Sequence, residues 1–290
     1  MCRTTLRSLR HALEWTRPLK FVPTMKKIKR LLVTLALGAV SSVFAAPSAQ
    51  ERPEWAGWFA QAPAVGTMLV LDARTPQAQL WVHNPQRAAQ RFSPASTFKI
   101  PHALFALEAG AIKDEFEVIP WDGVRRGNPA WDKDQDLRSS MRNSTVWVYE
   151  RFARQLGLKQ ETAFMEKIGY GNALSTGAEP FWVEGDLAIS AYEKLDFLQK
   201  LYRNQLPFKV EHQRLVKDLM INEAGADWIL RAKTGWSGTI GWWAGWVEWP
   251  TGPVFFVMNI DTPNRLGDLA KRQGISRQVL RSIQALPAVP

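Results

Sequence analysis

Residues 91–101 read Arg91-Phe92-Ser93-Pro94-Ala95-Ser96-Thr97-Phe98-Lys99-Ile100-Pro101. The other motifs of the sequence are interpreted in relation to this stretch. Ser93 is a good helix N-cap and Pro94 fits the first helical position, so a helix is predicted to begin here. On a helix, the hydroxyl of Ser96 and the amine of Lys99 lie one turn apart on the same face. A serine becomes a nucleophile when a neighbouring base takes its proton, and a neutral lysine can be that base. A Ser-x-x-Lys match arises about once by chance in a chain of this length, so partners for it must be found elsewhere.

The start of the chain has the pattern of a secretory signal peptide. Residues 25–30 are mostly basic, an apolar run follows from 31 to 44, and small residues come next. We expect residues 25–45 to be the signal peptide, cleaved between Ala45 and Ala46, and residues 1–24 to be an upstream extension that is not used. The apolar run is too short for a transmembrane helix, so we predict a periplasmic protein without a stable membrane anchor.

The net charge of +10 is concentrated in that first segment. Nine of the 37 Lys and Arg residues, and one of the 27 Asp and Glu residues, lie in residues 1–45. Residues 46–290 therefore carry 28 basic and 26 acidic side chains, a net charge of +2. This balance argues against a nucleic-acid partner. Cys2, the one cysteine, also lies there. His83, His102 and His212 lack zinc-ligand spacing, so no metal is predicted and these side chains are expected at the surface or packed inside.

The periodicity of the rest predicts strands at both ends and helices in the middle. Two predicted strands, at 66–72 and 79–83, follow a short helix at 53–59; three more lie at 228–233, 240–249 and 254–261, before a closing helix at 268–285. Between them the pattern is mostly helical, with helices at 145–156 and after a Ser190/Glu193 capping box. Pro101 requires that the first helix starts near Ser96 or is kinked after Lys99.

This order of elements predicts an α/β (α+β) fold in which one antiparallel sheet, built from both termini, is flanked by terminal helices. The sheet part spans about 46–90 and 222–290, and an inserted all-helical part spans about 91–221. Residues 46–290 together would form the catalytic domain.

Three further short motifs follow the serine. Ser144-Thr145-Val146 opens a predicted helix, Tyr170-Gly171-Asn172 lies in a loop, and Lys233-Thr234-Gly235 ends a predicted strand. A given tripeptide arises by chance about once in several thousand positions, so the ordered set is far more specific than Ser-x-x-Lys alone.

With these motifs the sequence resembles the penicillin-recognising serine acyltransferases, and within them the class D, or oxacillinase-type, β-lactamases. The similarity covers residues 46–290 and extends to the segments 181–185 and 241–246 and to Arg272. It implies a β-lactamase/transpeptidase-like fold and a hydrolase of cyclic amides that opens penicillins and related antibiotics, and so confers resistance. It also implies a β-lactam as the partner, no cofactor other than CO2, and a monomer or homodimer.

The resemblance implies an acyl-enzyme on Ser96 and a general base on Lys99. The oxyanion of the tetrahedral intermediate would be bound by the backbone N–H groups of Ser96 and Trp236. Burial beside Phe98, Val146 and Trp182 would keep the amine of Lys99 neutral. That amine would react with CO2 to give N6-carboxylysine, supported by the indole N–H of Trp182.

The remaining motif residues are implied to handle protons and substrate. Ser144 and Lys233 would relay the proton to the leaving nitrogen. Thr234, Gly235 and Arg272 would bind the substrate carboxylate, Arg272 through a charge-assisted fork. Taken alone, Ser144 reads equally as a helix cap, Arg272 as a solvated side chain and Tyr170-Gly171-Asn172 as a turn.

The sequence leaves alternatives open. A penicillin-sensing receptor domain would carry the same motifs and be acylated without turnover. A D,D-peptidase is less compatible, because Val146 stands where those enzymes usually carry Asn, and a tryptophan-based carbohydrate-binding module is a distant third class. Val183 replaces a bulkier aliphatic residue common in the family, which could alter access of water to the acyl-enzyme.

Overall fold

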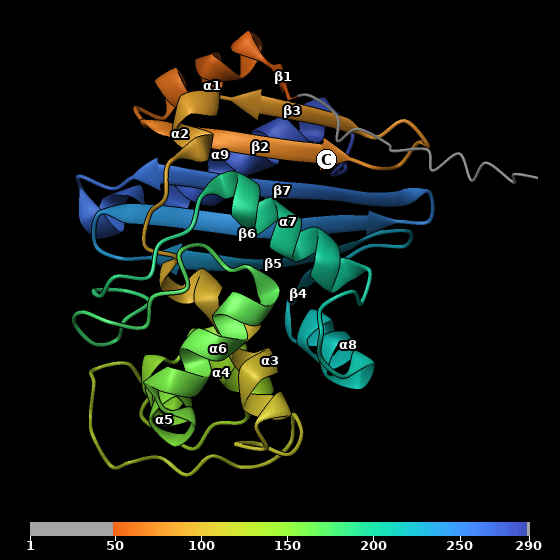
Figure 1. The fold of residues 1–290 in the computed structure, drawn as a ribbon. Helices are drawn as coiled ribbons and strands as arrows, with labels where there is room; N and C mark the ends of the chain where they lie inside the picture. The colour runs from red at the N-terminus through yellow and green to blue at the C-terminus, as the bar shows by residue number, and fades with distance from the viewer. Residues whose placement is uncertain (1–48, 289–290) are drawn as a thin grey trace, which may run out of the picture. The chain divides into compact units, whose positions relative to one another are not determined.

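A computed structural model describes residues 49–288 of the protein (Figure 1). The predicted extension, signal peptide and cleavage site lie outside these residues. Within them, no helix is both long enough and apolar enough to cross a membrane.

A mixed sheet contains strands from both ends of the described chain, as the sequence predicts. Its order is β1-β3-β2-β7-β6-β5-β4, and all neighbours are antiparallel except the short β1, which runs parallel to β3. Both β1 and β4 are short and fully exposed, which explains why the sequence pattern did not reveal them. The strands are β1 (Gln50–Glu51), β2 (Gly66–Asp72), β3 (Gln79–His83), β4 (Ile221–Ala224), β5 (Ile229–Trp236), β6 (Ile240–Trp249) and β7 (Gly252–Asp261).

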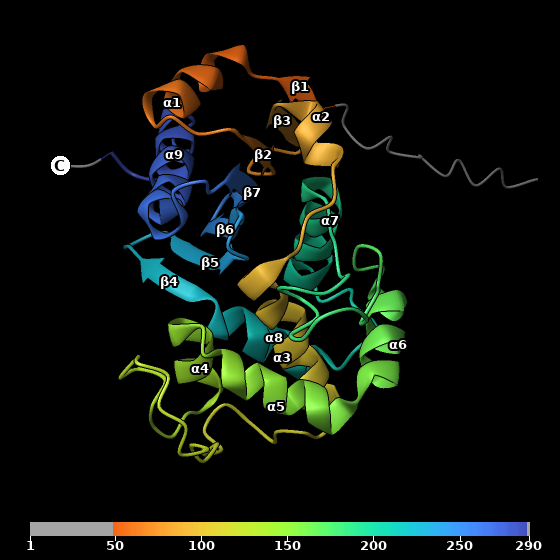
Figure 2. The same cartoon turned by 90° about the vertical axis from the view of Figure 1, so that its left-hand side faces the viewer.

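The central strands are buried on both faces, and their alternating side chains enter two separate cores. On β7, Phe255 and Val257 face the core shared with the helical segment, whereas Phe256 and Met258 face the core beneath the terminal helices. Figure 2 shows α7 (Ala191–Tyr202) on one side of the sheet and α9 (Leu269–Ser282), with α1 (Ala56–Gln61), on the other. The sheet is therefore the middle layer of three.

The segment between β3 and β4 is helical, as predicted, and most of it packs beside the sheet. Helix α3 contacts α5 and α8, while α5 also contacts α6. Helix α7 is the exception: it packs on β7 and covers one face of the sheet. The remaining elements are η1 (Pro53–Trp55), α2 (Pro85–Ala89), η2 (Ala95–Phe98), α3 (Lys99–Glu108), α4 (Leu137–Asn143), α5 (Val146–Leu156), α6 (Leu158–Ile168), α8 (Val210–Leu219) and η3 (Arg265–Asp268).

The predicted N-cap at Ser93 is wrong. A 3-10 turn, η2, precedes α3, and it begins after Pro94 without a side-chain cap. The hydroxyl of Ser93 instead bonds to main-chain oxygens of Trp182 and Val183, at 2.9 and 3.0 Å. Pro101 lies in the first turn of α3, where its missing N–H removes no helical hydrogen bond. The structure thus resolves the difficulty that Pro101 raised by starting the regular helix at Lys99.

Ser144 does not open a helix either. It follows the last residue of α4 in the left-handed conformation, with φ of 56°, and α5 begins two residues later after Thr145. The junction between two helices therefore presents the Ser144 side chain. The Ser190/Glu193 capping box at the start of α7 is confirmed, with both of its reciprocal hydrogen bonds formed.

Candidate active site

Ser96 and Lys99 are brought together as their spacing predicts. The Nζ atom of Lys99, the first residue of α3, lies 3.0 Å from the Oγ atom of Ser96 in η2. Ala95, directly before the serine, has φ of 48°, a left-handed conformation that is strained for a residue with a Cβ. Contacts outside the turn hold it in place, including a 2.8 Å hydrogen bond from the indole of Trp242 to the oxygen of Ser93.

The environment of Lys99 favours its neutral form. The side chain is completely buried, and its Nζ atom lies 5.0 Å from the ring centroid of Tyr149. Burial, followed by the positive charge of Lys233, holds the pKa of Lys99 well below its usual range. A lysine in this state has the free electron pair that a base requires.

The predicted aromatic wall is present. Phe98 and Trp182 are buried, and their rings stack with centroids 5.9 Å apart. The indole Nε1 of Trp182 has no hydrogen-bond acceptor among the described residues, a property it shares with three other buried tryptophans. Trp182 differs from those three in packing against both Phe98 and His102, which flank Lys99 along the chain.

Ser144 and Lys233 form a second hydroxyl–amine pair. The Nζ atom of Lys233 donates to Ser144 Oγ at 3.0 Å and to the main-chain oxygen of Thr234 at 3.2 Å. Burial, followed by the charge of Arg272, lowers the pKa of Lys233 to about 7. This amine can therefore exchange a proton near neutral pH.

Arg272 is buried beside β5 rather than solvated. Its Nη1 donates to the oxygen of Gly235 at 2.6 Å and its Nε to Leu269 at 2.8 Å. The stem passes over Gly241 of β6, where an added Cβ would lie 2.7 Å from Arg272 Cδ. Burial lowers the pKa of Arg272 to about 10, so the guanidinium is still cationic at neutral pH.

The C-terminal half of β5 extends beyond β4 and packs on η2. A Cβ at Gly235 would lie 3.0 Å from the main-chain oxygen of Pro94. The backbones of β5 and of the turn that carries Ser96 are therefore in direct contact, with no room for a side chain at Gly235. The predicted oxyanion donors, at Ser96 and Trp236, belong to these two elements.

A cavity of about 620 Å³ is lined by most of the residues that the sequence analysis predicted for the active site. It is lined by Ser96, Ser144, Val146, Thr234, Gly235, Trp236 and Arg272, with Val183 at its wall. Phe98, Trp182, Lys99 and Lys233 are buried and do not line this cavity. The sequence analysis assigned no role to the remaining lining residues, which come from loops, from α5 and from the start of α9: Arg126, Trp131, Trp147, Glu150, Pro180, Glu184 and Leu269.

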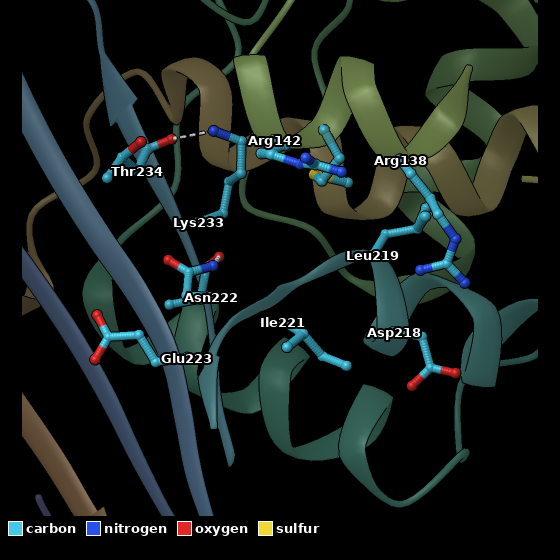
Figure 3. Close-up of a pocket in the computed structure, with 11 residues that line it drawn as sticks. Arg138, Arg142, Asp218, Leu219, Ile221, Asn222, Glu223, Lys233 and Thr234 are labelled. Atoms are coloured by element: carbon cyan, nitrogen blue, oxygen red, sulfur yellow. Dashed lines mark hydrogen bonds between the residues drawn. The ribbon is translucent and has the colours of Figure 1, made fainter. Parts of the chain in front are cut away.

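A second cavity, of about 540 Å³, is lined by Lys233 and Thr234 (Figure 3) and shares only Thr234 with the first. Arg138 and Arg142 of α4 form one wall, and Asn222 and Glu223 of β4 lie opposite. Ser96 does not line this cavity, so the chemistry is assigned to the first one.

His102, which follows Lys99 by three positions on α3, forms a buried pair with Glu161 that was not predicted from the sequence. His102 was expected to be a surface or packed residue; it is completely buried, and its Nε2 lies 2.7 Å from Oε1 of the equally buried Glu161.

The side chain of Asn172 holds the loop of the Tyr170-Gly171-Asn172 motif, accepting from Ala188 N at 2.9 Å and donating to Asp186 O at 2.7 Å. That motif is structural here.

Comparisons with known proteins agree with this geometry. Residues 66–283 match the family described as the penicillin binding protein transpeptidase domain. Beta-lactamase OXA-2 of Escherichia coli is 61% identical over 83% of this chain and 88% of its own, and beta-lactamase OXA-48 of Klebsiella pneumoniae is 39% identical over 89% and 100%. The crystal structure of the class D β-lactamase YbXI from Nostoc superposes with a TM-score of 0.76 at 38% identity, over 80% of this chain and 99% of that one. The chain belongs to the class D β-lactamases.

Membership of this family makes the chain a hydrolase of β-lactams, with the penicillin-binding type of domain that the motifs predicted. The cavity at η2 and β5 is therefore the candidate site for that reaction.

Proposed function

We propose that this class D β-lactamase opens its substrate through an acyl-enzyme on Ser96. The observation that carries the proposal is the 3.0 Å approach of the buried Lys99 amine to the Ser96 hydroxyl. Lys99 takes the hydroxyl proton while Ser96 Oγ bonds to the β-lactam carbonyl carbon. Main-chain N–H groups of Ser96 and Trp236 stabilise the oxyanion, since η2 and β5 both border the cavity.

Cleavage of the ring C–N bond then requires a proton on the leaving nitrogen. Lys233 and Ser144 supply it, because their 3.0 Å hydrogen bond and the lowered pKa of Lys233 permit proton exchange near neutral pH. Arg272 and Thr234, which line the same cavity as Ser96, hold the substrate carboxylate. Water then hydrolyses the ester, which releases the ring-opened acid and restores Ser96.

The surroundings of Lys99 fit a carboxylated lysine. Its amine is buried, which holds its pKa well below the usual range, and the indole N–H of Trp182, which packs against Phe98 and His102, has no acceptor among the described residues. Addition of CO2 with loss of one proton would provide a carboxylate, a general base for both half-reactions. Trp182 would hold that group, and Val146 with Phe98 would keep water from it.

Time-resolved mass spectrometry with a penicillin tests these roles. The wild-type protein should gain the mass of one penicillin and lose it again, with the label mapping to Ser96. Ser96→Ala should gain none, whereas Lys99→Ala should retain any acyl group that it acquires. Added bicarbonate should raise the activity of CO2-depleted enzyme. A wild-type protein that is never acylated, or that is labelled at another residue, would refute the assignment.

We also propose export to the periplasm and a contribution to β-lactam resistance, supported by the signal-peptide pattern of residues 25–45. The N-terminal sequence of protein recovered from a periplasmic extract should begin at Ala46. Monomer or homodimer remains a prediction, which sedimentation of the purified protein would decide.

A further inference from the structure

Lys194 of α7 is a second lysine buried beside the nucleophile turn, and the reaction proposed above does not use it. Its side chain is 2% exposed, and its Nζ donates to Oγ1 of Thr97. No carboxylate among residues 49–288 forms an ion pair with it. Even the neighbouring Glu193 is directed elsewhere, to Arg91 and to the main-chain N–H of Ser190.

The partner of Lys194 lies at the junction of three elements. Thr97 follows Ser96 in η2, and its hydroxyl donates to the oxygen of Pro94 at 2.6 Å, which closes the turn. That hydroxyl has one hydrogen, so its oxygen accepts the hydrogen bond from Lys194. On its other side Thr97 meets β5, because a Cβ at Gly235 would lie 3.2 Å from the main-chain nitrogen of Thr97. Lys194 therefore reaches the turn where the turn contacts the strand.

The amine of Lys194 is buried without a carboxylate partner among the described residues. Its Nζ atom lies 4.5 Å from the ring centroid of Trp242 and 5.8 Å from that of Tyr170, so cation–π attraction offsets part of the cost of burial. Burial still holds the pKa of Lys194 well below its usual range. Removing an amine from water without a carboxylate is unfavourable compared with burying an apolar side chain of similar length. A purely structural role would be filled better by methionine.

We propose that Lys194 is a positioning residue for acylation, which holds the Ser96 turn against β5 through Thr97 at the expense of stability. The proposal rests on the assignment of Ser96 as the nucleophile. The proposed role depends on the hydrogen bond that Lys194 donates to Thr97, not on the positive charge of the amine. A neutral hydrogen-bond donor at position 194 should therefore hold the turn as well.

The test compares Lys194→Met, which removes the donor, with Lys194→Gln, which keeps one. We expect Lys194→Met to be acylated by a penicillin on the order of ten-fold more slowly, because the turn loses its outer support. The same variant should melt at a higher temperature than the wild type. Lys194→Gln should recover most of the acylation rate. Lys200→Met, at a partly exposed position on the same helix, is the control; it removes a surface ion pair with Asp196, which contributes little to stability, and should leave the acylation rate unchanged and the melting temperature nearly so.

A double substitution isolates the contact. In a Thr97→Val background, Lys194→Met should cause little further loss of acylation rate, since its partner is already gone. An unchanged acylation rate in Lys194→Met would overturn the proposal, as would a lower melting temperature with no recovery in Lys194→Gln. These results are distinct from failure of the catalytic assignment, which would show as absence of label on Ser96 in the wild-type protein.

Discussion

The hydroxyl of Ser93 donates a hydrogen bond to the main-chain oxygen of Trp182 over 2.9 Å, between residues 89 positions apart. The oxygen of Val183 lies 3.0 Å from the same hydroxyl. Ser93 precedes the turn that carries Ser96, and Trp182 forms the wall beside Lys99. This contact therefore joins the nucleophile turn to the loop that covers the base.

Ser93→Ala should remove the hydrogen bond that holds the turn of Ser96 to the loop of Trp182. We expect a loss of about 1 kcal/mol in the free energy of unfolding, the usual contribution of one hydrogen bond. Release of the acyl-enzyme should slow more than its formation, because the cover of Lys99 becomes mobile while Ser96 keeps its other contacts. Quenched-flow mass spectrometry measures both rates. Thr75→Ala, which removes an exposed hydroxyl bonded to Gln77, is the control, and equal slowing of both steps would contradict the prediction.

The stability of the protein should rise between pH 7 and pH 9.5. Burial lowers the pKa of Lys233 to about 7 in the folded state, and that of Lys99 well below its usual range, whereas both are near 10.4 in the unfolded chain. In this window the unfolded chain binds more protons, so raising the pH favours folding, by at most about 1.4 kcal/mol per pH unit for each group. Below pH 7 the contribution of Lys233 levels off.

Urea denaturation at several pH values measures this slope. Lys233→Met should reduce it, because it removes one of the three buried lysines whose pKa is lowered in the folded state, Lys99, Lys194 and Lys233. Lys200→Met, at a partly exposed position, should leave it unchanged. A stability that falls with pH over this window in the wild-type protein would contradict the prediction.

Gly241→Ala should disturb substrate binding through Arg272. The new Cβ would lie 2.7 Å from Arg272 Cδ, so the arginine stem must move from its place beside Gly235. We expect KM for penicillins to rise on the order of ten-fold with a smaller change in kcat, since the affected contact is to the substrate carboxylate. Gly274→Ala is the matched control on α9, because nothing lies within 4 Å of its Cβ. An unchanged KM would show that Arg272 adjusts without loss.

Glu161→Gln should destabilise the core behind Lys99. The Nε2 atom of His102 and the Oε1 atom of Glu161 are completely buried and 2.7 Å apart, and leaving a buried polar group without a good partner costs about 1–3 kcal/mol. The double variant His102→Phe/Glu161→Leu should recover much of this loss, because it leaves no polar group without a partner. Thermal unfolding measures both. Equal destabilisation by the single and double variants would indicate that packing, rather than the pair, sets the stability.

Local patterns accounted for much of the fold. Strands β2 and β3 occupy the predicted residues, and α7 starts at its predicted capping box. These features depend on neighbours along the chain, where alternation and capping preferences act directly. The prediction of Ser93 as a cap failed because a partner 89 positions away, unrecognisable in the sequence, binds its hydroxyl instead.

For the active site, the sequence by itself determined which side chains could do the chemistry. It also determined that Ser96 and Lys99 would meet, since they are three positions apart, about one helical turn. Tertiary structure decided everything that depends on distant segments. It buried Lys99, placed Lys233 of β5 against Ser144 at the α4–α5 junction, and laid Arg272 over Gly241. The pKa values and the cavity arise from these contacts, because desolvation and charge act through space and not along the chain.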